Sequence, residues 1–407
     1  MVCGLLGHKL GHSYSPQIHR LLGNYSYDLF EKEPDQLEEF LLHPNFDGLN
    51  VTIPYKKAVL PYCTDLSPIA KELGSVNTII RRNDGTLFGH NTDYFGFASM
   101  IDHAGITVAG KKVLVLGSGG AAVTACAVLN AMHAHVVQIS RNGKNHYGNL
   151  NLHADAAVIV NATPVGMYPN NEAAPLDLSL FPKLEGVLDL IYNPAHTRLL
   201  EQANQLGVKT ENGLWMLVAQ AYESACYFTN TKLPQQLIEH IYKLLCADMK
   251  NIVLIGMPGS GKTTIGRMLS QLTGKVFVDS DYEIEIEAGM SIPEYLSKYG
   301  EPAFRKLESK VLSRIGKESR CIIATGGGCV TKEENYTHLH QNSTIVWIKR
   351  PLSDLPVDGR PISQKTSAEA LYQARKPLYE AFADLTVHNT SPEETAKTIL
   401  SMINGGT

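Results

Sequence analysis

The sequence predicts a chain of the α/β class with more than one domain. Short apolar runs such as VLVL at 113–116 and AVIV at 157–160 alternate with polar turns and longer stretches typical of helices. Two glycine-rich turns, GSGGAA at 117–122 and GMPGSGKT at 256–263, directly follow such runs. Strands that alternate with helices predict parallel sheets. A length of 407 residues is that of two or three domains.

The first hundred residues have their own alternation of apolar runs and turns. LFEKEP, GLNVTI and VNTIIRR are the predicted strands, and we expect residues 1–100 to form a separate α/β lobe. A second lobe is predicted at 101–213. It begins with VLVL, its glycine turn and the helix-like AAVTACAVLNAM, and continues with strands at 135–139, 157–160 and 187–191.

The remaining sequence predicts helices and then a third region. Residues 214–245 have a helical pattern throughout, and we expect the helices of 214–247 to return to the first lobe. KNIVLIG at 250–256 predicts a new strand, which opens a domain at 248–407. The main boundary is expected near 246–249, with a linker of only a few residues.

Composition excludes several classes of protein. A net charge of -4 without a basic stripe gives no basis for nucleic-acid binding. No apolar run reaches the roughly 18 residues of a membrane span, and the N-terminus lacks the pattern of a signal peptide. The seven cysteines form no C-x-x-C and are odd in number. We therefore expect a cytoplasmic protein with reduced thiols that acts on small molecules, and the oligomeric state stays open.

GMPGSGKT has the G-x-x-x-x-G-K-[ST] spacing of a nucleotide phosphate loop. Its glycines let backbone N–H groups surround phosphate oxygens at the start of the next helix. Lys262 can reach the β- and γ-phosphates, and Thr263 can hold Mg²⁺. A purely structural turn is the competing interpretation, which the Lys-Thr pair after a strand disfavours. The predicted ATP-binding residues of the loop are Gly259, Ser260, Gly261, Lys262, Thr263 and Thr264.

Later motifs indicate the acceptor of the phosphoryl group. FVDSD places Asp279 and Asp281 after a predicted strand, where one acid can serve a metal and the other a hydroxyl. FRKLE puts Arg305 and Glu308 at i, i+3, which by itself usually indicates a surface pair. ATGGGC at 324–329 should let a ligand approach bare backbone. With Arg375 of ARKPLY, these residues predict a pocket for a small polyhydroxy carboxylate, because Arg binds carboxylates bidentately.

Residues of about 250–407 resemble shikimate kinases. The resemblance rests on six motifs in order along the chain: GMPGSGKTTIG, DSD, FRKLE, TGGG, GRP and RKPLY. The resemblance implies that Lys262 and Arg360 contact the phosphates and that Thr263 and Asp279 hold Mg²⁺. The stretch IKRPLSDLPVDGRP before Arg360 is shorter than the usual lid of that family. The residues that the resemblance assigns to shikimate are Asp281, Arg305, Gly327, Gly328 and Arg375.

GSGGAA fits the G-x-G-x-x-A pattern of a Rossmann-like dinucleotide turn. No acid ends the next strand, where Asp or Glu would bind the ribose of NAD. Arg141, with Lys144 nearby, instead favours the 2′-phosphate of NADP; a solvent-facing arginine is the alternative. A lysine held by an acid can protonate a carbonyl that is being reduced, and Lys56 and Asp93 are the candidates. By spacing alone, two separate surface charges are the simpler interpretation.

Residues of about 1–245 resemble shikimate dehydrogenases. The resemblance rests on eight motifs: GHSYSPQIH, NVTIPYK, SVNT, GHNTD, GSGGA, NATPVGM, DLIYNP and GLWMLVAQ. The resemblance implies a catalytic Lys56 beside Asp93. The residues implied at the substrate are Ser13, Ser15, Thr52, Lys56, Asn77, Asp93, Tyr192 and Gln220. Those implied at the cofactor are Gly117, Gly119, Gly120, Ala121, Ser140, Arg141, Asn161, Thr163, Gly213 and Met216. The chain has Ser140-Arg141-Asn142 for the common Asn-Arg-Thr, and Ala122 and Val123 where an arginine is often found, which bears on the strength of the NADP preference.

Together the patterns predict a two-lobed dehydrogenase with a Rossmann-like NADP lobe, followed by a P-loop kinase-type parallel α/β domain. The implied reactions are reduction of 3-dehydroshikimate with NADPH and phosphorylation of shikimate with ATP and Mg²⁺. One alternative is an NAD-linked quinate/shikimate dehydrogenase joined to a different small-molecule kinase. Another is a kinase-like half that binds nucleotide without catalysis. The presence of Lys262, Asp281 and Arg305 disfavours this alternative.

Overall fold

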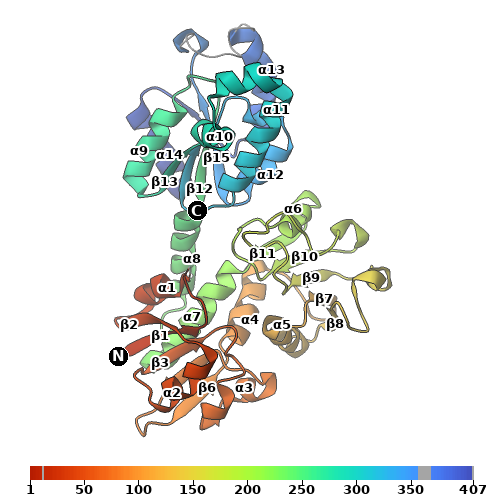
Figure 1. Cartoon of the computed structure of the whole chain (residues 1–407). Coiled ribbons are helices and arrows are strands. Elements are labelled where there is room, and N and C mark those ends of the chain that lie inside the picture. Colours follow the sequence, from red (N-terminus) through yellow and green to blue (C-terminus); the bar gives the residue numbers. More distant parts are fainter. Residues whose placement is uncertain (12, 356–367, 406–407) are drawn as a thin grey trace. The chain divides into compact units, whose positions relative to one another are not determined.

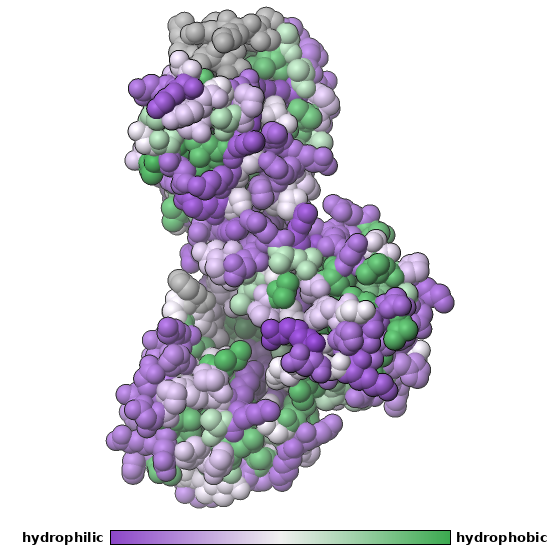
Figure 2. Space-filling view, turned by 45° about the vertical axis from the view of Figure 1, so that its right-hand side comes forward, coloured by the Kyte–Doolittle hydropathy of each residue, from purple (hydrophilic) through white to green (hydrophobic). Residues whose placement is uncertain are grey.

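A computed structural model describes residues 1–11, 13–355 and 368–405 (Figure 1). The chain divides into two compact units, Met1–Tyr242 and Lys243–Thr407, which we call the first and the second unit. Among the described residues, no helix is long and apolar enough to cross a membrane. Hydrophilic residues cover most of the visible face in Figure 2, and the hydrophobic ones form small groups, as on a solvated surface.

The first lobe of the first unit is built on a mixed sheet of order β2-β1-β3-β5-β6-β4. Strand β1 is parallel to β2 and β3, whereas β5 runs antiparallel to β3 and β6. Apolar side chains such as Leu6, Leu49 and Ile79 are fully buried in its core. The elements are β1 (Val2–Gly7), α1 (Ser15–Leu22), β2 (Ser26–Glu31), α2 (Leu37–Leu42), β3 (Gly48–Val51), β4 (Asp65–Leu66), α3 (Pro68–Leu73), β5 (Thr78–Arg81) and β6 (Leu87–His90).

The second lobe is a parallel sheet of order β11-β10-β9-β7-β8. Strand order reverses at β7, and ligands of open α/β sheets bind beyond the carboxyl ends of strands at such a reversal. Leu199 and Leu200 of α6 pack with Leu114 and Ile159 in the core. The elements are α4 (Asp93–Ala104), β7 (Lys112–Leu116), α5 (Gly120–Ala131), β8 (His135–Ile139), β9 (Val158–Asn161), β10 (Gly186–Asp189), α6 (Arg198–Gln205) and β11 (Lys209–Asn212).

Helix α7 (Leu214–Thr229) returns to the first lobe, and α8 (Gln236–Met249) follows it. The prediction of helix throughout 214–245 is wrong at 230–235, because Asn230 ends α7 in the left-handed conformation, with φ 48°. The predicted linker near 246–249 is also wrong, since α8 continues through it to Met249. The helix contains no Gly or Pro, and Ile238, Ile241 and Leu245 are buried at helical spacing.

The second unit has a parallel sheet of order β13-β14-β12-β15-β16. Side chains that alternate along β12 pack on opposite faces: Ile252 with α9 and α14, and Val253 with α11 and α12 (Figure 1). The elements are β12 (Asn251–Ile255), α9 (Lys262–Thr273), β13 (Val276–Asp279), α10 (Ser280–Ala288), α11 (Ile292–Ile315), β14 (Cys321–Ala324), α12 (Glu334–His340), β15 (Ser343–Lys349), α13 (Ala368–Phe382), β16 (Leu385–His388) and α14 (Pro392–Gly405).

Short 3-10 helices complete the described structure and lie mainly between the larger elements. They are η1 (Pro34–Gln36), η2 (Leu60–Tyr62), η3 (Tyr147–His153), η4 (Leu178–Leu180), η5 (Cys329–Thr331) and η6 (Leu352–Asp354). The predicted fold class, a two-lobed α/β unit followed by a parallel α/β domain with a phosphate loop, is confirmed.

Candidate active sites

A cavity of about 630 Å³ lies between the two lobes of the first unit. Strand ends and helix starts from both lobes line it. All the residues that the sequence predicts at the substrate are among its lining: Ser13, Ser15, Thr52, Lys56, Asn77, Asp93, Tyr192 and Gln220. Three of the predicted cofactor residues line the same cavity, namely Ala121, Gly213 and Met216.

The charged centre of this cavity is a lysine–aspartate contact. Lys56 Nζ donates a hydrogen bond to Asp93 Oδ2, although 37 residues separate the two along the chain. Asn77 Nδ2 donates to the other carboxylate oxygen, Asp93 Oδ1, at 2.9 Å. The lysine side chain is 28% exposed and the aspartate 14%. The two residues therefore form one partly buried pair and not two separate surface charges.

The start of helix α4 fixes the position of Asp93. Its backbone N–H donates to Asn91 Oδ1 at 3.1 Å, and Asn91 Nδ2 donates to Ser75 O at 3.1 Å. Asn77 Oδ1 accepts from the backbone N–H of Thr92 at 2.7 Å. Asp93 is the first residue of α4, where the helix dipole favours a negative charge. These contacts orient the carboxylate towards Lys56.

Hydroxyl and amide groups surround the pair. Ser13 Oγ accepts from the backbone N–H of Ser15 at 3.2 Å, immediately before α1. Thr52 follows β3, and Gln220 lies on α7. Tyr192 packs edge-on against Tyr14, with ring centroids 6.2 Å apart. A cavity with several hydroxyls and an amide can bind a ligand that carries several hydroxyl groups.

The glycine turn after β7 forms the cofactor side of the second lobe. Gly117 has φ 114°, and a Cβ there would lie 3.0 Å from Ala162 O. Gly119 and Gly120, at the start of α5, have open space within 4 Å of the position of a Cβ. Such a bare helix N-terminus can accept a pyrophosphate.

Two further predicted cofactor residues are linked by hydrogen bonds at the end of β9. Thr163 Oγ1 donates to Asn161 Oδ1 at 2.7 Å, and Asn161 Nδ2 donates to Asp189 Oδ1 at 3.0 Å. Burial raises the pKa of Asp189 to about 6. Beyond β8, the backbone N–H of Ser140 donates to Asn145 O at 3.1 Å, and Arg141 is exposed.

The phosphate loop of the second unit runs from β12 to α9. Lys262 is buried, and its Nζ donates to Gly256 O and Met257 O, each at 2.9 Å. Thr263 Oγ1 donates to Asp279 Oδ2 at 3.0 Å, so the residues predicted to hold Mg²⁺ are in contact. The Ser260 Oγ is buried and has no hydrogen-bond partner among the described atoms. Thr264 is exposed, in the first turn of α9.

A buried ion pair lies beside this loop. Arg305 Nη1 donates to Glu308 Oε2 at 2.7 Å, and Arg305 Nη2 donates to Glu301 Oε1 at 3.1 Å. The side chains of Arg305 and Glu308 are only 8% and 1% exposed, so the interpretation as a surface pair is wrong. Burial raises the pKa of Glu308, and the charge of Arg305 opposes that shift. The pair is buried because the inner face of α11 packs on the sheet.

The glycine run after β14 lies against polar side chains of the protein itself. A Cβ on Gly326 would lie 2.7 Å from Asp281 Oδ1, and one on Gly328 would lie 2.3 Å from the guanidinium nitrogens of Arg305. The lack of a side chain at Gly326 and Gly328 therefore leaves room for Asp281 and Arg305, and the approach of a ligand to this backbone stays a prediction. Arg375 Nη1 donates to Gly327 O at 3.0 Å. The structure thus brings together the five residues assigned to the acceptor, with the glycines making room for the side chains.

The family models match the chain in two places. Residues 5–79 match "Shikimate dehydrogenase substrate binding domain" and residues 258–404 match "Shikimate kinase". A shikimate dehydrogenase (NADP(+)) of Clostridium perfringens strain SM101 is 35% identical over 264 residues, which are 60% of this chain and 97% of that protein. The chain belongs to the shikimate dehydrogenase family. We call its first unit the dehydrogenase unit and its second, which carries the shikimate kinase domain, the kinase unit.

Solved structures agree with the family of the dehydrogenase unit. Shikimate dehydrogenase 1 from Peptoclostridium difficile is 38% identical, with a TM-score of 0.54, over 60% of this chain and 97% of that one. A chorismate mutase/shikimate 5-dehydrogenase fusion protein from Clostridium acetobutylicum is 35% identical, with a TM-score of 0.57, over 60% and 96%. A quinate dehydrogenase from Corynebacterium glutamicum, in complex with NAD, is 27% identical, with a TM-score of 0.54, over 59% and 98%.

Sequence reasoning missed Lys9 in the dehydrogenase unit. Lys9 lines the cavity, and the other charged residues among the described lining are Lys56 and Asp93. Because Lys56 is paired with Asp93, Lys9 gives the cavity a net positive charge that favours an anion. The signal was available, since GHKLGHSYS places this lysine just before Ser13 and Ser15.

In the kinase unit, sequence reasoning missed three side chains that donate hydrogen bonds to backbone carbonyls of the phosphate loop and of the glycine run. Tyr379 OH donates to Gly327 O at 2.6 Å, and Arg350 Nη1 donates to Gly259 O at 3.2 Å. Asn389 Nδ2 donates to Ser260 O at 2.8 Å. Two of these residues lie in stretches that the sequence analysis singled out, Tyr379 in RKPLY and Arg350 in IKRPLSDLPVDGRP. The predicted Arg360 lies outside the described residues.

Proposed function

We propose that the dehydrogenase unit reduces 3-dehydroshikimate to shikimate with NADPH. The observation that carries this proposal is the Lys56–Asp93 contact, in a cavity lined by every residue predicted at the substrate. The open space at Gly119 and Gly120 fits a dinucleotide pyrophosphate. Ser140 and Arg141, after β8, are proposed at the ribose 2′-phosphate, since no acid takes that place.

The side chains account for the proton that reduction requires. NADPH, when bound, supplies a hydride to the carbonyl carbon. Lys56 gives a proton from its ammonium group to the carbonyl oxygen, which converts the C=O bond to an alcohol, and regains a proton from solvent. Asp93 holds the ammonium in place, and Asn77 holds Asp93. Ser13, Ser15, Thr52, Tyr192 and Gln220 are proposed to bind the substrate, and Asn161, Thr163, Gly213 and Met216 to line the nicotinamide.

We propose that the kinase unit phosphorylates shikimate. ATP, when bound, supplies the γ-phosphoryl group. Asp281 takes the proton of the attacking hydroxyl, and its pKa is raised because the surrounding protein desolvates it and because Asp279 lies nearby. Arg305 and Arg375 are proposed to bind the carboxylate. The oxygens of Thr263 and Asp279 suit Mg²⁺ in chemistry, and the unpartnered Ser260 Oγ suits a phosphate.

The product of one reaction is then the acceptor of the other, on one chain. In this proposal residues 1–100 bind the substrate and residues 101–213 bind the cofactor. The helices of 214–247 return to the first lobe, and residues 248–407 form the kinase. A coupled assay that follows NADPH loss and ADP formation from 3-dehydroshikimate tests this proposal. We expect 3-dehydroshikimate to raise the rate of ADP formation above the background of ATP hydrolysis only when NADPH is present. Shikimate that fails to elicit ADP from the wild-type chain would leave the kinase unit as a nucleotide-binding module.

The shortened lid and Arg360 are tested separately. We propose that Arg360 stabilises the charge of the transferring phosphoryl group, as such arginines do in related chemistry. Arg360→Ala should lower kcat by roughly 10³-fold or more. A shorter lid excludes less water, so ATP hydrolysis without shikimate should be detectable. Equal shikimate phosphorylation by Arg360→Ala and the wild type would contradict this role.

A competing proposal changes the dehydrogenase substrate to quinate with NAD. It draws on the similarity to the quinate dehydrogenase from Corynebacterium glutamicum. Oxidation rates of shikimate and quinate, each with NADP and with NAD, separate the two proposals. We expect shikimate with NADP to give the highest kcat/KM.

A further inference from the structure

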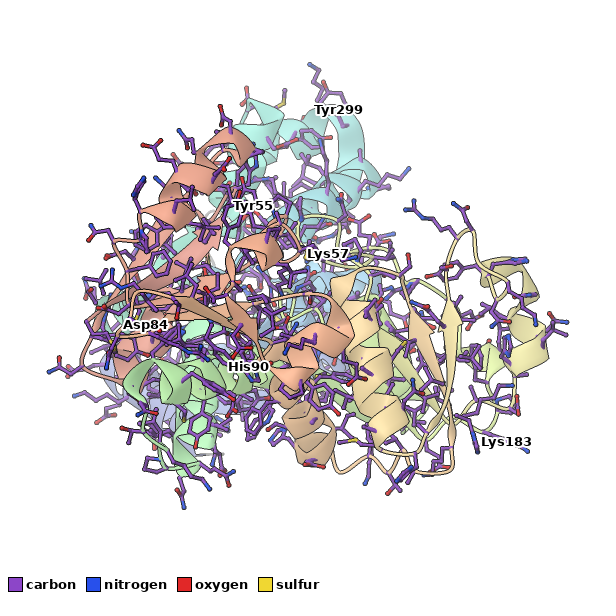
Figure 3. The ribbon with its side chains drawn as sticks, turned by 90° about the horizontal axis from the view of Figure 1, so that it is seen from below. Tyr55, Lys57, Asp84, His90, Lys183 and Tyr299 are labelled. Carbon is purple, nitrogen blue, oxygen red and sulfur yellow. The ribbon has the colours of Figure 1, made fainter. Side chains whose placement is uncertain are left out.

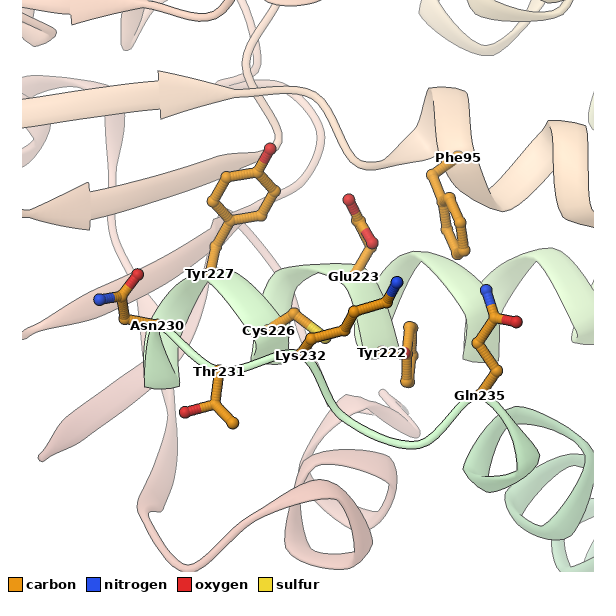
Figure 4. A pocket seen from close by; sticks show the side chains of 9 residues that line it. All are labelled: Phe95, Tyr222, Glu223, Cys226, Tyr227, Asn230, Thr231, Lys232 and Gln235. Carbon is orange, nitrogen blue, oxygen red and sulfur yellow. The ribbon is translucent and has the colours of Figure 1, made fainter.

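The dehydrogenase unit contains a second cavity of about 470 Å³ (Figure 4). This volume lies in the range of roughly 300–1,000 Å³ that is usual for small-molecule sites. Its walls come from the start of α4, the last turns of α7 and the segment 230–235 that leads to α8. The lining residues are Phe95, Tyr222, Glu223, Cys226, Tyr227, Asn230, Thr231, Lys232 and Gln235.

This cavity is adjacent to the active-site cavity but distinct from it. Met216 and Gln220 line the first cavity, and Glu223 and Tyr227 line the second. The four residues follow one another at i, i+4, i+7 and i+11, on one face of α7. No residue lines both cavities among those described.

The wall formed by 230–235 is fastened to α7. Tyr222 OH donates to Leu233 O, and the backbone N–H of Leu233 donates to Cys226 Sγ at 3.4 Å. The backbone N–H of Thr231 donates to Cys226 O at 3.1 Å. The cavity is therefore preformed by hydrogen bonds, which lowers the cost of ordering it around a ligand.

Aromatic rings form its apolar part. Phe95 and Tyr222 stack with ring centroids 6.2 Å apart and planes at 25°. Tyr227 packs against His90, with centroids 4.4 Å apart, and is 36% exposed. These rings offer faces and edges to a flat or apolar group.

Two opposite charges in the cavity have no partner. Glu223 is half-buried, and its side chain makes no hydrogen bond or ion pair with any described residue. Lys232 is exposed and likewise has neither kind of contact in the described chain. Both side chains extend into the space bordered by Phe95 and Tyr227 (Figure 4). Burial raises the pKa of Glu223, as expected for a carboxylate that lacks a cation.

We propose that this cavity binds a small zwitterion with an aromatic body, of the chemical class of aromatic α-amino acids. Glu223 would accept hydrogen bonds from the ammonium group, and Lys232 would donate to the carboxylate. Phe95, Tyr222 and Tyr227 would cover the ring. Each charge of the ligand thereby meets an unpaired opposite charge, and the net charge of the complex does not change. This inference does not depend on the function proposed above.

Calorimetric titration of the full chain with L-phenylalanine, L-tyrosine and L-tryptophan tests the proposal. We expect saturable binding of at least one of them, weakened about tenfold or more by Glu223→Gln and by Lys232→Met, because each removes a charge-assisted contact. The matched controls are Glu72→Gln and Lys183→Met, which change exposed charges outside the cavity lining; Lys183 is labelled in Figure 3. They should bind as the wild type does.

A second set of titrations uses ligands that lack one of the two charges. Phenethylamine and 3-phenylpropionate should each bind at least about tenfold more weakly than L-phenylalanine. Shikimate should not displace the bound amino acid. Absence of binding by all three amino acids, equal binding by the charge-deleted ligands, competition with shikimate, or affinity unchanged in the Glu223 and Lys232 variants would each overturn the proposal.

Discussion

Lys56 is held by Asp93 at the one place in the dehydrogenase cavity where a lysine and an acid meet among the described lining residues. Lys56→Met removes the proposed proton donor while keeping much of the side-chain volume. The dehydrogenase kcat should fall by about 10²–10⁴-fold, because a positioned acid contributes that much. Stopped-flow absorbance of NADPH measures it, and added shikimate should still elicit normal ADP formation. Retention of most dehydrogenase turnover would remove Lys56 from this role.

Lys9 should act on binding alone. Lys9→Met removes a positive charge from the cavity lining without touching Lys56 or Asp93. We expect a higher KM for 3-dehydroshikimate at nearly unchanged kcat, since a contact to an unreacting carboxylate is equal in ground and transition states. Initial-rate kinetics at low and high salt measure the effect, which should shrink as salt screens the charge.

Lys57→Met is the matched control for Lys9. Lys57, which is labelled in Figure 3, is exposed, lies next to Lys56 in sequence and is not part of the cavity lining. It should have wild-type kinetics. If both variants raise KM equally, the effect comes from the overall charge of the unit and not from the cavity.

At the scale of elements, two of the ion pairs made by side chains of helix α11 lie in opposite surroundings. Arg305 and Glu308 are buried, whereas Arg314 of α11 meets Glu283 of α10 at 2.9 Å with 51% and 25% exposure. Glu308→Gln should lower the free energy of unfolding of the kinase unit by up to about 3–5 kcal/mol, since it leaves the buried guanidinium of Arg305 with Glu301, whose side chain is 53% exposed, as its remaining ion-pair partner. Glu283→Gln should cost less than about 1 kcal/mol.

Tryptophan fluorescence can measure the loss of stability in these two variants for the kinase unit alone. The chain has two tryptophans, Trp215 in the dehydrogenase unit and Trp347 in the kinase unit. A Trp215→Phe background leaves Trp347 as the reporter of urea-induced unfolding. Equal losses of stability in the two glutamine variants would show that burial does not distinguish the pairs.

Helix α8 also illustrates how element boundaries arise. Its C-terminal carbonyls of Ala247 and Asp248 accept hydrogen bonds from Lys275 Nζ, at 3.0 and 2.6 Å. Burial lowers the pKa of Lys275 to about 8. The end of the helix is therefore stabilised by a residue 27 positions away from Asp248, which a local pattern cannot reveal.

At the scale of the whole molecule, buried histidines make stability depend on pH. Burial lowers the pKa of His19 to about 3 and that of His90 to about 4. The unfolded chain takes up these protons near pH 6.5, so it binds more protons than the folded one below that pH. The free energy of unfolding of the dehydrogenase unit should thus fall as the pH drops from about 6.5 towards 4.

The contribution of His90 can be isolated. Its Nδ1 is buried without a hydrogen-bond partner among the described atoms, and its ring packs on Tyr227. His90→Phe keeps a ring and removes the titration, so the loss of stability between pH 7 and pH 5 should be smaller than in the wild type. Urea unfolding in a Trp347→Phe background, followed by Trp215, measures it. An unchanged loss would mean that other groups account for the acid sensitivity.

Contacts within short segments could be predicted from the sequence. The phosphate loop, the GSGGAA turn and the strands before them depend on neighbours along the chain, and their backbone geometry follows from glycine and from helix starts. The α/β class followed from the same local patterns. The residues predicted at the dehydrogenase substrate came from motif resemblance, and the fold then brought them into one cavity.

Tertiary structure alone decided what depends on distant partners. The burial of Arg305 and Glu308, the packing of the glycine run against Asp281 and Arg305, and the place of Lys9 in one cavity with Lys56 and Asp93 all depend on segments that are far apart in sequence. The second cavity likewise exists only where α4, α7 and the segment 230–235 meet. Sequence patterns report the spacing of residues along one element, whereas burial and charge pairing depend on which elements pack together.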